Sequence, residues 1–201
     1  IRDSSVILIL SLSCLFNQES FNTRQQSDLI HRVLTSEQQN KIEKAVEIAY
    51  VGDLILLRDQ VREAYCDKRD LYDFDPVFAY AGRYFAESDF SIGVLEGPFA
   101  GSDKGYSTSN YDDGIPLYLN FPDSFAKAIK NAQIDLVTLA NNHLLDMKPE
   151  GVFRTLDLLD EIELKHVGAY RNETEKQQIK LLEVEGLKIA FLSYSFPSNY
   201  Y

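Results

Sequence analysis

The chain has 201 residues, of which 45% are hydrophobic and 12% aromatic, so it is long enough and apolar enough for one globular domain with a sizeable core. Its formal net charge is −11 and its calculated pI is about 4.7. This acidity argues against a nucleic-acid-binding protein, because such proteins gain most of their affinity from basic side chains on phosphate groups.

The first 44 residues are expected to lie outside the globular domain. An apolar run of eleven residues, 6–16, is too short to cross a bilayer as a helix, but it has the length of a signal-peptide core. Cys14 suggests a lipoprotein cleavage site, and the alternative is that the run is a buried strand or helix. We interpret residues 1–20 as a signal peptide or lipoprotein anchor and residues 21–44 as a linker. Cys66 then has no partner, so no intramolecular disulfide is expected.

Strand-like and helix-like segments alternate from residue 45 onward. The expected strands are residues 46–51, 90–95, 134–139 and 165–167, followed by a hairpin of residues 180–184 and 188–194. The expected helices are residues 59–68, 76–87, 123–131 and 149–162. A long insertion at residues 101–117 is expected to be functional or disordered. This order of elements predicts an α/β protein in which helices cover a sheet.

Three of the expected strands are followed by side chains that can bind a metal ion. Asp53 follows the first strand, Glu96 the second, and Asn142 with His143 the third. In open α/β sheets, ligands bind at the carboxyl ends of the strands, so these side chains are expected to converge. Divalent cations bind carboxylate and amide oxygens, and Zn, Mn and Fe also accept imidazole. The alternative is that the two carboxylates belong to ordinary turns or caps and that His143 is a hydrogen-bonded core residue.

The same residues resemble a known family. The segments that carry the resemblance are Gly52-Asp53-Leu54, Val94-Leu95-Glu96, and Ala140-Asn141-Asn142-His143 with Asp146. They are similar to the CapA family of poly-γ-glutamate capsule biosynthesis proteins, from about residue 45 to residue 201. That family is itself similar to calcineurin-like metallophosphoesterases. The resemblance implies an α/β, metallophosphoesterase-like sandwich of two sheets covered by helices.

The resemblance also implies roles for individual residues. Four of them would occupy the metal or catalytic positions: Asp53, Glu96, Asn142 and His143. The cofactor would be a divalent metal ion, either Mn, Zn, Fe or Mg, with Asn142 as a ligand. His143 would act as an acid or contact the scissile group.

The chain departs from the family pattern at three points. Val94 stands where an asparagine is usual, which removes one potential polar ligand. Lys148 stands where a glycine is common, at a position that can require a positive φ. The family's later histidine motifs do not occur in the sequence, so residues 45–201 are interpreted as the N-terminal part of a CapA-like domain. Such a part would lack metal ligands and would be inactive by itself.

Two functions follow from the resemblance. The first is an exported, metal-dependent hydrolase-like domain that acts on a phosphoester or amide bond in an anionic cell-surface polymer. The second is a non-catalytic polymer-binding or accessory subunit of a capsule synthesis and export machinery. Both predict an extracytoplasmic position at the cell envelope, secreted or attached to the membrane through the N-terminal anchor. An acidic domain would need a bridging cation or a local basic patch to hold polyglutamate.

Overall fold

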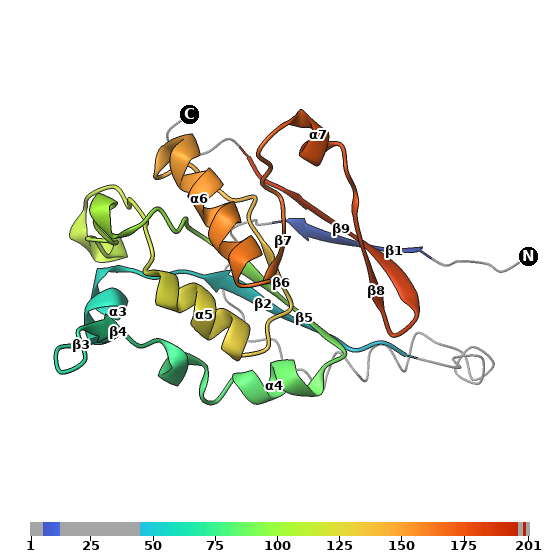
Figure 1. Cartoon of the computed structure of the whole chain (residues 1–201), viewed down its shortest axis with the longest axis horizontal. Coiled ribbons are helices and arrows are strands. Elements are labelled where there is room, and N and C mark those ends of the chain that lie inside the picture. The colour runs from blue at the N-terminus through green and yellow to red at the C-terminus, as the bar shows by residue number, and fades with distance from the viewer. Residues whose placement is uncertain (1–5, 13–44, 197–198, 200–201) are drawn as a thin grey trace, which may run out of the picture.

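The computed structural model describes residues 6–12, 45–196 and 199 (Figure 1). The strands are β1 Val6–Leu12, β2 Ile48–Leu54, β3 Tyr65–Cys66, β4 Leu71–Tyr72, β5 Phe90–Leu95, β6 Leu136–Thr138, β7 Lys165–Val167, β8 Lys180–Val184 and β9 Leu187–Tyr194. The α-helices are α3 Arg58–Glu63, α4 Gly82–Glu87, α5 Asp123–Asn131, α6 Lys148–Glu161 and α7 Glu173–Lys176. The described residues also form three 3-10 helices: η1 Asp75–Phe78, η2 Ser102–Lys104 and η3 Tyr111–Asp113.

Two larger sheets and a two-stranded sheet, β3 with β4, are present in the described residues. The larger sheet has the order β2-β5-β6-β7, and its strands all run parallel. The smaller sheet has the order β1-β9-β8, in which β9 is parallel to β1 and antiparallel to β8. One face of the larger sheet packs against α4, α5 and α6, and the other face packs against β8 and β9 (Figure 1). The predicted α/β sandwich of two sheets with a helical cover is confirmed.

The alternation of side chains along β5 explains why there are two apolar cores. Phe90 and Ile92 pack against the smaller sheet, where they meet Phe191 among others. Leu95 packs against the helices. All six residues of β5 are buried, as expected for a parallel strand that is covered on both faces. Each large apolar side chain that is buried in this way stabilises the fold by about 1.5–3 kcal/mol.

Most of the elements lie where the sequence predicts them. β5, α5 and β7 have the predicted bounds, and β2, β6, α6 and the β8–β9 hairpin differ by a few residues. The helix predicted at 76–87 is wrong in one respect, because it is split into η1 and α4. Gly82, which has a low helix propensity, begins the second piece. The helix predicted at 59–68 ends at Glu63, and the chain continues into the β3–β4 hairpin.

The N-terminal apolar run contributes a strand. β1 pairs with β9 from Val6 opposite Lys188 to Leu12 opposite Tyr194. This is the alternative that the sequence analysis placed second, behind a signal-peptide core. The pairing does not test whether the segment directs export, so the assignment of residues 1–20 stays a prediction. The linker at 21–44 lies outside the described residues.

None of the helices in the described part of the chain is long and apolar enough to cross a bilayer.

Lys148 has a backbone conformation that favours glycine. It is the first residue of α6 and its φ is +60°. The expectation that this position requires a positive φ is confirmed. A left-handed conformation costs a residue with a Cβ atom about 1–2 kcal/mol relative to glycine.

We therefore expect the substitution Lys148→Gly to stabilise the fold. The relief of strain exceeds the extra chain entropy of glycine, so the free energy of unfolding should rise by about 0.5–1 kcal/mol. Lys127→Gly is the matched control, because Lys127 is also exposed but lies inside α5. The control should lose about 1 kcal/mol. Urea unfolding measures both, and equal losses at the two positions would show that the positive φ carries no strain.

Candidate functional site

Asp53 comes from a β-bulge at the end of β2. The register of β2 against β5 shifts just before Asp53, so Gly52 lies in the bulge and Asp53 stands opposite Val94. Gly93 makes room for this strand, since a Cβ atom there would lie 2.6 Å from Leu54 Cδ1. Bulges of this kind redirect a side chain at the edge of a sheet. The result is an exposed Asp53 carboxylate at the carboxyl end of the larger sheet.

Glu96 follows β5 and lies beside Asp53. Its backbone N–H donates to the carbonyl oxygen of Leu54 at 3.2 Å, and its side chain is half-buried. Burial, with the charge of Asp53 and a hydrogen bond to it, raises the pKa of Glu96 from 4.5 to about 7, whereas the charge of His143 lowers it. The structure therefore brings Asp53, Glu96 and His143 together, as the strand order predicts.

Asn141 holds the turn that follows β6. Its Nδ2 donates to the carbonyl oxygens of Leu95 at 2.7 Å and Leu139 at 3.1 Å, and its Oδ1 accepts from the backbone N–H of His143 at 3.0 Å. These three hydrogen bonds of the buried amide link the turn to the end of β5. The role of Asn141 is therefore structural. Asn142 is half-buried, and its backbone carbonyl oxygen accepts from the N–H of Asn199 at 3.0 Å. Asn142 is thus next to the site, with its backbone engaged.

His143 and Asp146 form a buried pair in the same turn. His143 Nδ1 lies 2.7 Å from Asp146 Oδ2, and the residues are 6% and 7% exposed. Asp146 Oδ2 also accepts from the backbone N–H of Leu119 at 2.8 Å, which fixes the carboxylate. With Nδ1 facing a carboxylate, the imidazole presents Nε2 on its other side, where Asn199 Nδ2 lies at 3.5 Å. Such a carboxylate–histidine pair sets the tautomer and the orientation of an imidazole that binds a metal or transfers a proton.

Tyr111 is a site residue that the sequence analysis missed. It begins η3 in the insertion at 101–117, and two contacts hold this segment on α3: Arg58 Nη1 to Asp113 Oδ2 at 2.7 Å, and Asn110 Nδ2 to Asp59 Oδ2 at 2.8 Å. Partial burial and the charges of Glu96 and Asp53 raise the pKa of Tyr111. The insertion was expected to be functional or disordered. Only the fold shows that it presents a phenol, 64% exposed, near the two carboxylates.

The donor set fits a divalent cation in part. Within the ranges that the structure describes, no group of three or more His, Cys, Asp or Glu side chains is placed to hold a metal ion. The carboxyl groups of Asp53 and Glu96 nevertheless lie close together. Burial is the first cause of the raised pKa of Glu96, and the charge of Asp53 is the second. A cation would relieve that repulsion and would favour the ionised form of both groups. One Asp146 oxygen, Oδ1, is also buried without a partner among the described residues.

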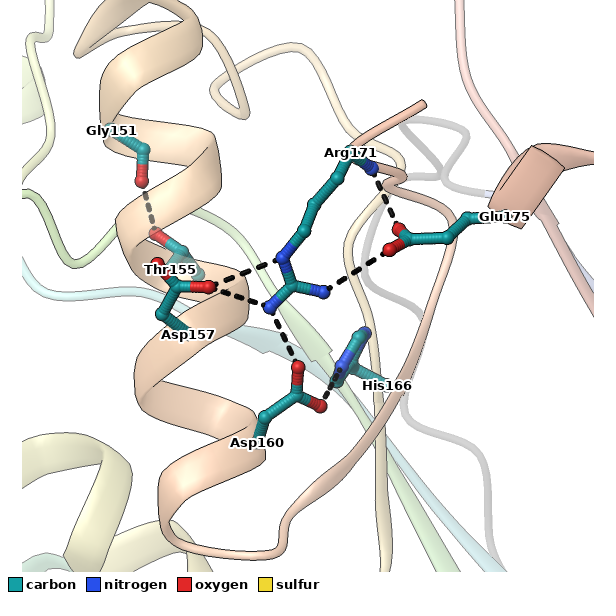
Figure 2. Close-up of polar contacts among 7 residues, drawn as sticks. All are labelled: Gly151, Thr155, Asp157, Asp160, His166, Arg171 and Glu175. Carbon is teal, nitrogen blue, oxygen red and sulfur yellow. Dashed lines mark hydrogen bonds and ion pairs between the residues drawn. The ribbon is translucent and has the colours of Figure 1, made fainter. Parts of the chain in front are cut away.

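A second polar cluster, centred on Arg171, braces the loop after β7 (Figure 2). Arg171 Nη2 contacts Asp157 Oδ1 at 2.8 Å and Asp160 Oδ2 at 2.6 Å, and both acidic residues lie on α6. The backbone N–H of Arg171 donates to Glu175 Oε2 at 2.8 Å in α7. His166 Nε2 lies 3.0 Å from Asp160, and burial lowers the pKa of His166. The guanidinium is engaged by carboxylates on two helices, so this cluster positions the loop.

The raised pKa of Glu96 makes a prediction about pH. A folded-state pKa of about 7 against 4.5 means that the protonated form is favoured by folding. That contribution is fully present below pH 4.5 and is lost as the pH rises through about 7. The variant Glu96→Gln cannot ionise, so it should gain stability relative to the wild type between pH 5 and pH 8. Urea unfolding at both values measures the gain, with the exposed Glu183→Gln in β8 as control. A constant difference between Glu96→Gln and wild type would contradict the crowding of the two carboxyl groups.

Comparisons with known proteins agree with the family resemblance seen in the sequence. Residues 47–200 match the family model described as bacterial capsule synthesis protein PGA_cap. The chain is 30% identical over 146 residues to capsule biosynthesis protein CapA of Bacillus anthracis. The aligned region covers 72% of the chain and 33% of that protein. It is 27% identical over 153 residues to PGA biosynthesis protein CapA of Bacillus subtilis (strain 168), which covers 75% of the chain and 37% of that protein. The chain therefore spans about a third of the length of the curated relatives it matches.

Proposed function

The chain belongs to the bacterial capsule synthesis protein family, and from this premise we propose that it acts on an anionic cell-surface polymer through a divalent-cation site at its strand ends. The names of its relatives suggest poly-γ-glutamate as the polymer. One observation carries the proposal. The carboxyl groups of Asp53 and Glu96 lie together beside the imidazole of His143, which Asp146 orients.

The residues divide the chemistry between them. Asp53 and Glu96 would hold the cation, and the amide of Asn142 is the neutral ligand nearest in sequence to His143. When bound, a divalent cation polarises a carbonyl or phosphoryl oxygen and lowers the pKa of a bound water. His143 would hold or deliver a proton at Nε2, while Asp146 accepts from Nδ1–H. With these roles the protein would act as a metal-dependent hydrolase on an amide or phosphoester bond.

The charge of the protein supports a cation at this point. A chain with a net charge of −11 repels a polyanion, so a bare pair of carboxylates would be a poor contact for polyglutamate. A divalent cation between them neutralises the two carboxylates, and carboxylates of the polymer could complete its oxygen shell. The same site would therefore bind the polymer and act on it.

The second candidate function is a polymer-binding or accessory subunit without turnover, within a synthesis and export machinery. The observation that favours it is the incomplete donor set among the described residues. In this case the cation would link polymer and protein, and His143 would be a contact. For either function we propose an extracytoplasmic position at the cell envelope, with residues 1–20 as the export signal or anchor.

Metal titration tests the proposed site. At pH 8, a hundredfold excess of Mn²⁺ or Zn²⁺ over the dissociation constant should stabilise the protein by about 2.7 kcal/mol through binding to the native state. Asp53→Asn and Glu96→Gln should remove most of this gain, because they keep the shape of the side chain and lose its charge. The control Glu183→Gln should keep it. If wild type and variants melt alike with and without metal, the strand-end residues are structural.

A further inference from the structure

The ring nitrogen of His143 that faces away from Asp146 has a neighbour from a distant part of the chain. Asn199 Nδ2 lies 3.5 Å from His143 Nε2, although 56 positions separate the two residues in the sequence. The backbone N–H of Asn199 donates to the carbonyl oxygen of Asn142 at 3.0 Å, so Asn199 is fixed to the turn that carries the imidazole. The proposed hydrolase chemistry uses Nε2 of His143 but assigns no part to Asn199.

The smaller sheet delivers Asn199 to this position. β9 ends shortly before Asn199, and its last residues lie against the turn that follows β6. The evidence is at Gly168, where a Cβ atom would be 2.8 Å from both Ser193 Oγ and the backbone nitrogen of Ala140. The other residues of the candidate site follow strands of the larger sheet. Asn199 is therefore the contribution of the smaller sheet to the same site.

The chemistry of the two ring nitrogens decides the direction of this contact. Asp146 Oδ2 lies 2.7 Å from Nδ1 of His143, and a carboxylate can only accept, so Nδ1 carries the proton. In a neutral imidazole Nε2 is then an acceptor. The group that faces Nε2 must donate, and the side-chain NH2 of Asn199 can do so. The imidazole is thus held at both nitrogens, with the lone pair of Nε2 directed toward Asn199.

The contact between Asn199 and His143 is one that an entering group can replace. Its 3.5 Å length exceeds the distance of about 3 Å that is usual for such a hydrogen bond, and Asn199 is exposed, so its side chain can rotate. An acceptor beside a donor matches an O–H group, whose hydrogen donates to Nε2 and whose oxygen accepts from Nδ2. A carboxylate or phosphoryl oxygen matches the amide alone, because it has no hydrogen to donate.

We propose that Asn199 is a positioning residue of the candidate site. In the resting protein it donates to Nε2 of His143 and holds the imidazole. When an O–H group enters, Asn199 donates to the oxygen of that group while its hydrogen faces Nε2. The O–H group that a hydrolase requires is water, so this part of the inference rests on the proposed function. The contact with the imidazole is independent of it.

Nitrogen-15 NMR of the imidazole rings tests the contact in the metal-free chain at pH 8. The chain contains three histidines, so the spectrum has few signals, and His143→Ala assigns those of His143. Wild type should show a protonated Nδ1 and an unprotonated Nε2. In Asn199→Ala the chemical shift of Nε2 should change, whereas Nδ1 should stay protonated. His166 is the internal reference, because it pairs with Asp160 outside the site (Figure 2) and its signals should not move.

Turnover by the full-length protein tests the role toward the entering group. Asn199→Ala should lower kcat about threefold to tenfold, the effect of one hydrogen bond, and leave KM unchanged, because the donor acts on the group at Nε2. Asn199→Asp should lose at least as much, since it keeps the shape of the side chain but has no hydrogen to donate. Asn131→Ala, which replaces an exposed asparagine of α5, is the matched control and should keep the wild-type kcat.

The outcomes separate this inference from the proposed function. An Nε2 signal that is identical in wild type and Asn199→Ala would overturn the contact, and a wild-type proton on Nε2 instead of Nδ1 would overturn its direction. If the full-length wild type shows no turnover while the Nε2 signal responds to Asn199→Ala, the hydrolase is wrong and the positioning of His143 stands. Wild-type kcat in Asn199→Asp would overturn the role toward the O–H group. Loss of kcat in both Asn199 variants, with an altered Nε2 signal, supports the inference.

Discussion

Replacement of Gly168 with alanine should destabilise the protein by about 2–5 kcal/mol, as the sum of a strained backbone and an overpacked contact. The residue has a φ of +100°, which side-chain-bearing residues rarely adopt. A new Cβ atom would also lie 2.8 Å from the backbone nitrogen of Ala140 and 2.9 Å from Ser193 Cβ. The first of these is a backbone atom that cannot move without shifting the turn of His143. The substitution therefore strains both β7 and β9 at the carboxyl end of the sheets.

Two other glycines separate the causes of this loss. Gly186 has a φ of +82° with no atom within 4 Å of an added Cβ, so Gly186→Ala should lose only the backbone contribution, about 1 kcal/mol. Gly52 also has open space and lacks a positive φ, so Gly52→Ala should be nearly neutral. Urea unfolding of the three variants gives the comparison. A Gly168→Ala variant as stable as Gly186→Ala would mean that the strand ends are not packed as closely as described.

Replacement of His143 with alanine should give the largest functional effect. If the full-length protein is a hydrolase, its turnover of the polymer should fall by about a hundred- to ten-thousandfold, the usual contribution of a placed acid–base group. Asp146→Asn should also lower turnover, because Asp146 Oδ2 accepts from the imidazole at 2.7 Å and sets its tautomer. The assay follows release of polymer ends or phosphate in the presence of Mn²⁺.

A second histidine provides the control for this experiment. His166 is half-buried and pairs with Asp160 on the Arg171 cluster, outside the strand-end site. His166→Ala should keep wild-type turnover. In a non-catalytic binding protein, wild type would show no turnover, and His143→Ala would change the affinity for the polymer only modestly. Turnover that survives His143→Ala unchanged would exclude the assigned role.

Several parts of the fold could be predicted because local patterns determine them. β5 is a mostly apolar run between Asp89 and Glu96, and it is buried on both faces. α5 begins after Pro122 and buries Phe125 and Ile129 at helical spacing. Three parallel strands with polar residues at their carboxyl ends are enough to predict that Asp53, Glu96 and His143 converge.

Other features depend on contacts between distant parts of the chain. The bulge at Gly52 depends on the space that Gly93 leaves in the neighbouring strand. The position of Tyr111 depends on contacts between η3 and α3, which are about 50 residues apart, as the 55-residue separation of Arg58 and Asp113 shows. No local pattern marks either feature. The pairing of β1 with β9 spans nearly the whole chain, and composition alone favoured a signal-peptide core for the same run.

The most direct test of the strand-end site is a crystal structure of the protein grown at pH 8 with Zn²⁺, recorded at the zinc absorption edge. We expect an anomalous peak about 2.0–2.2 Å from carboxylate oxygens of both Asp53 and Glu96. His143 should lie beside the ion, with Nδ1 still on Asp146. The same peak should disappear in Glu96→Gln. A peak elsewhere, or an unaltered carboxyl pair without an ion, would contradict a metal site at the ends of these strands.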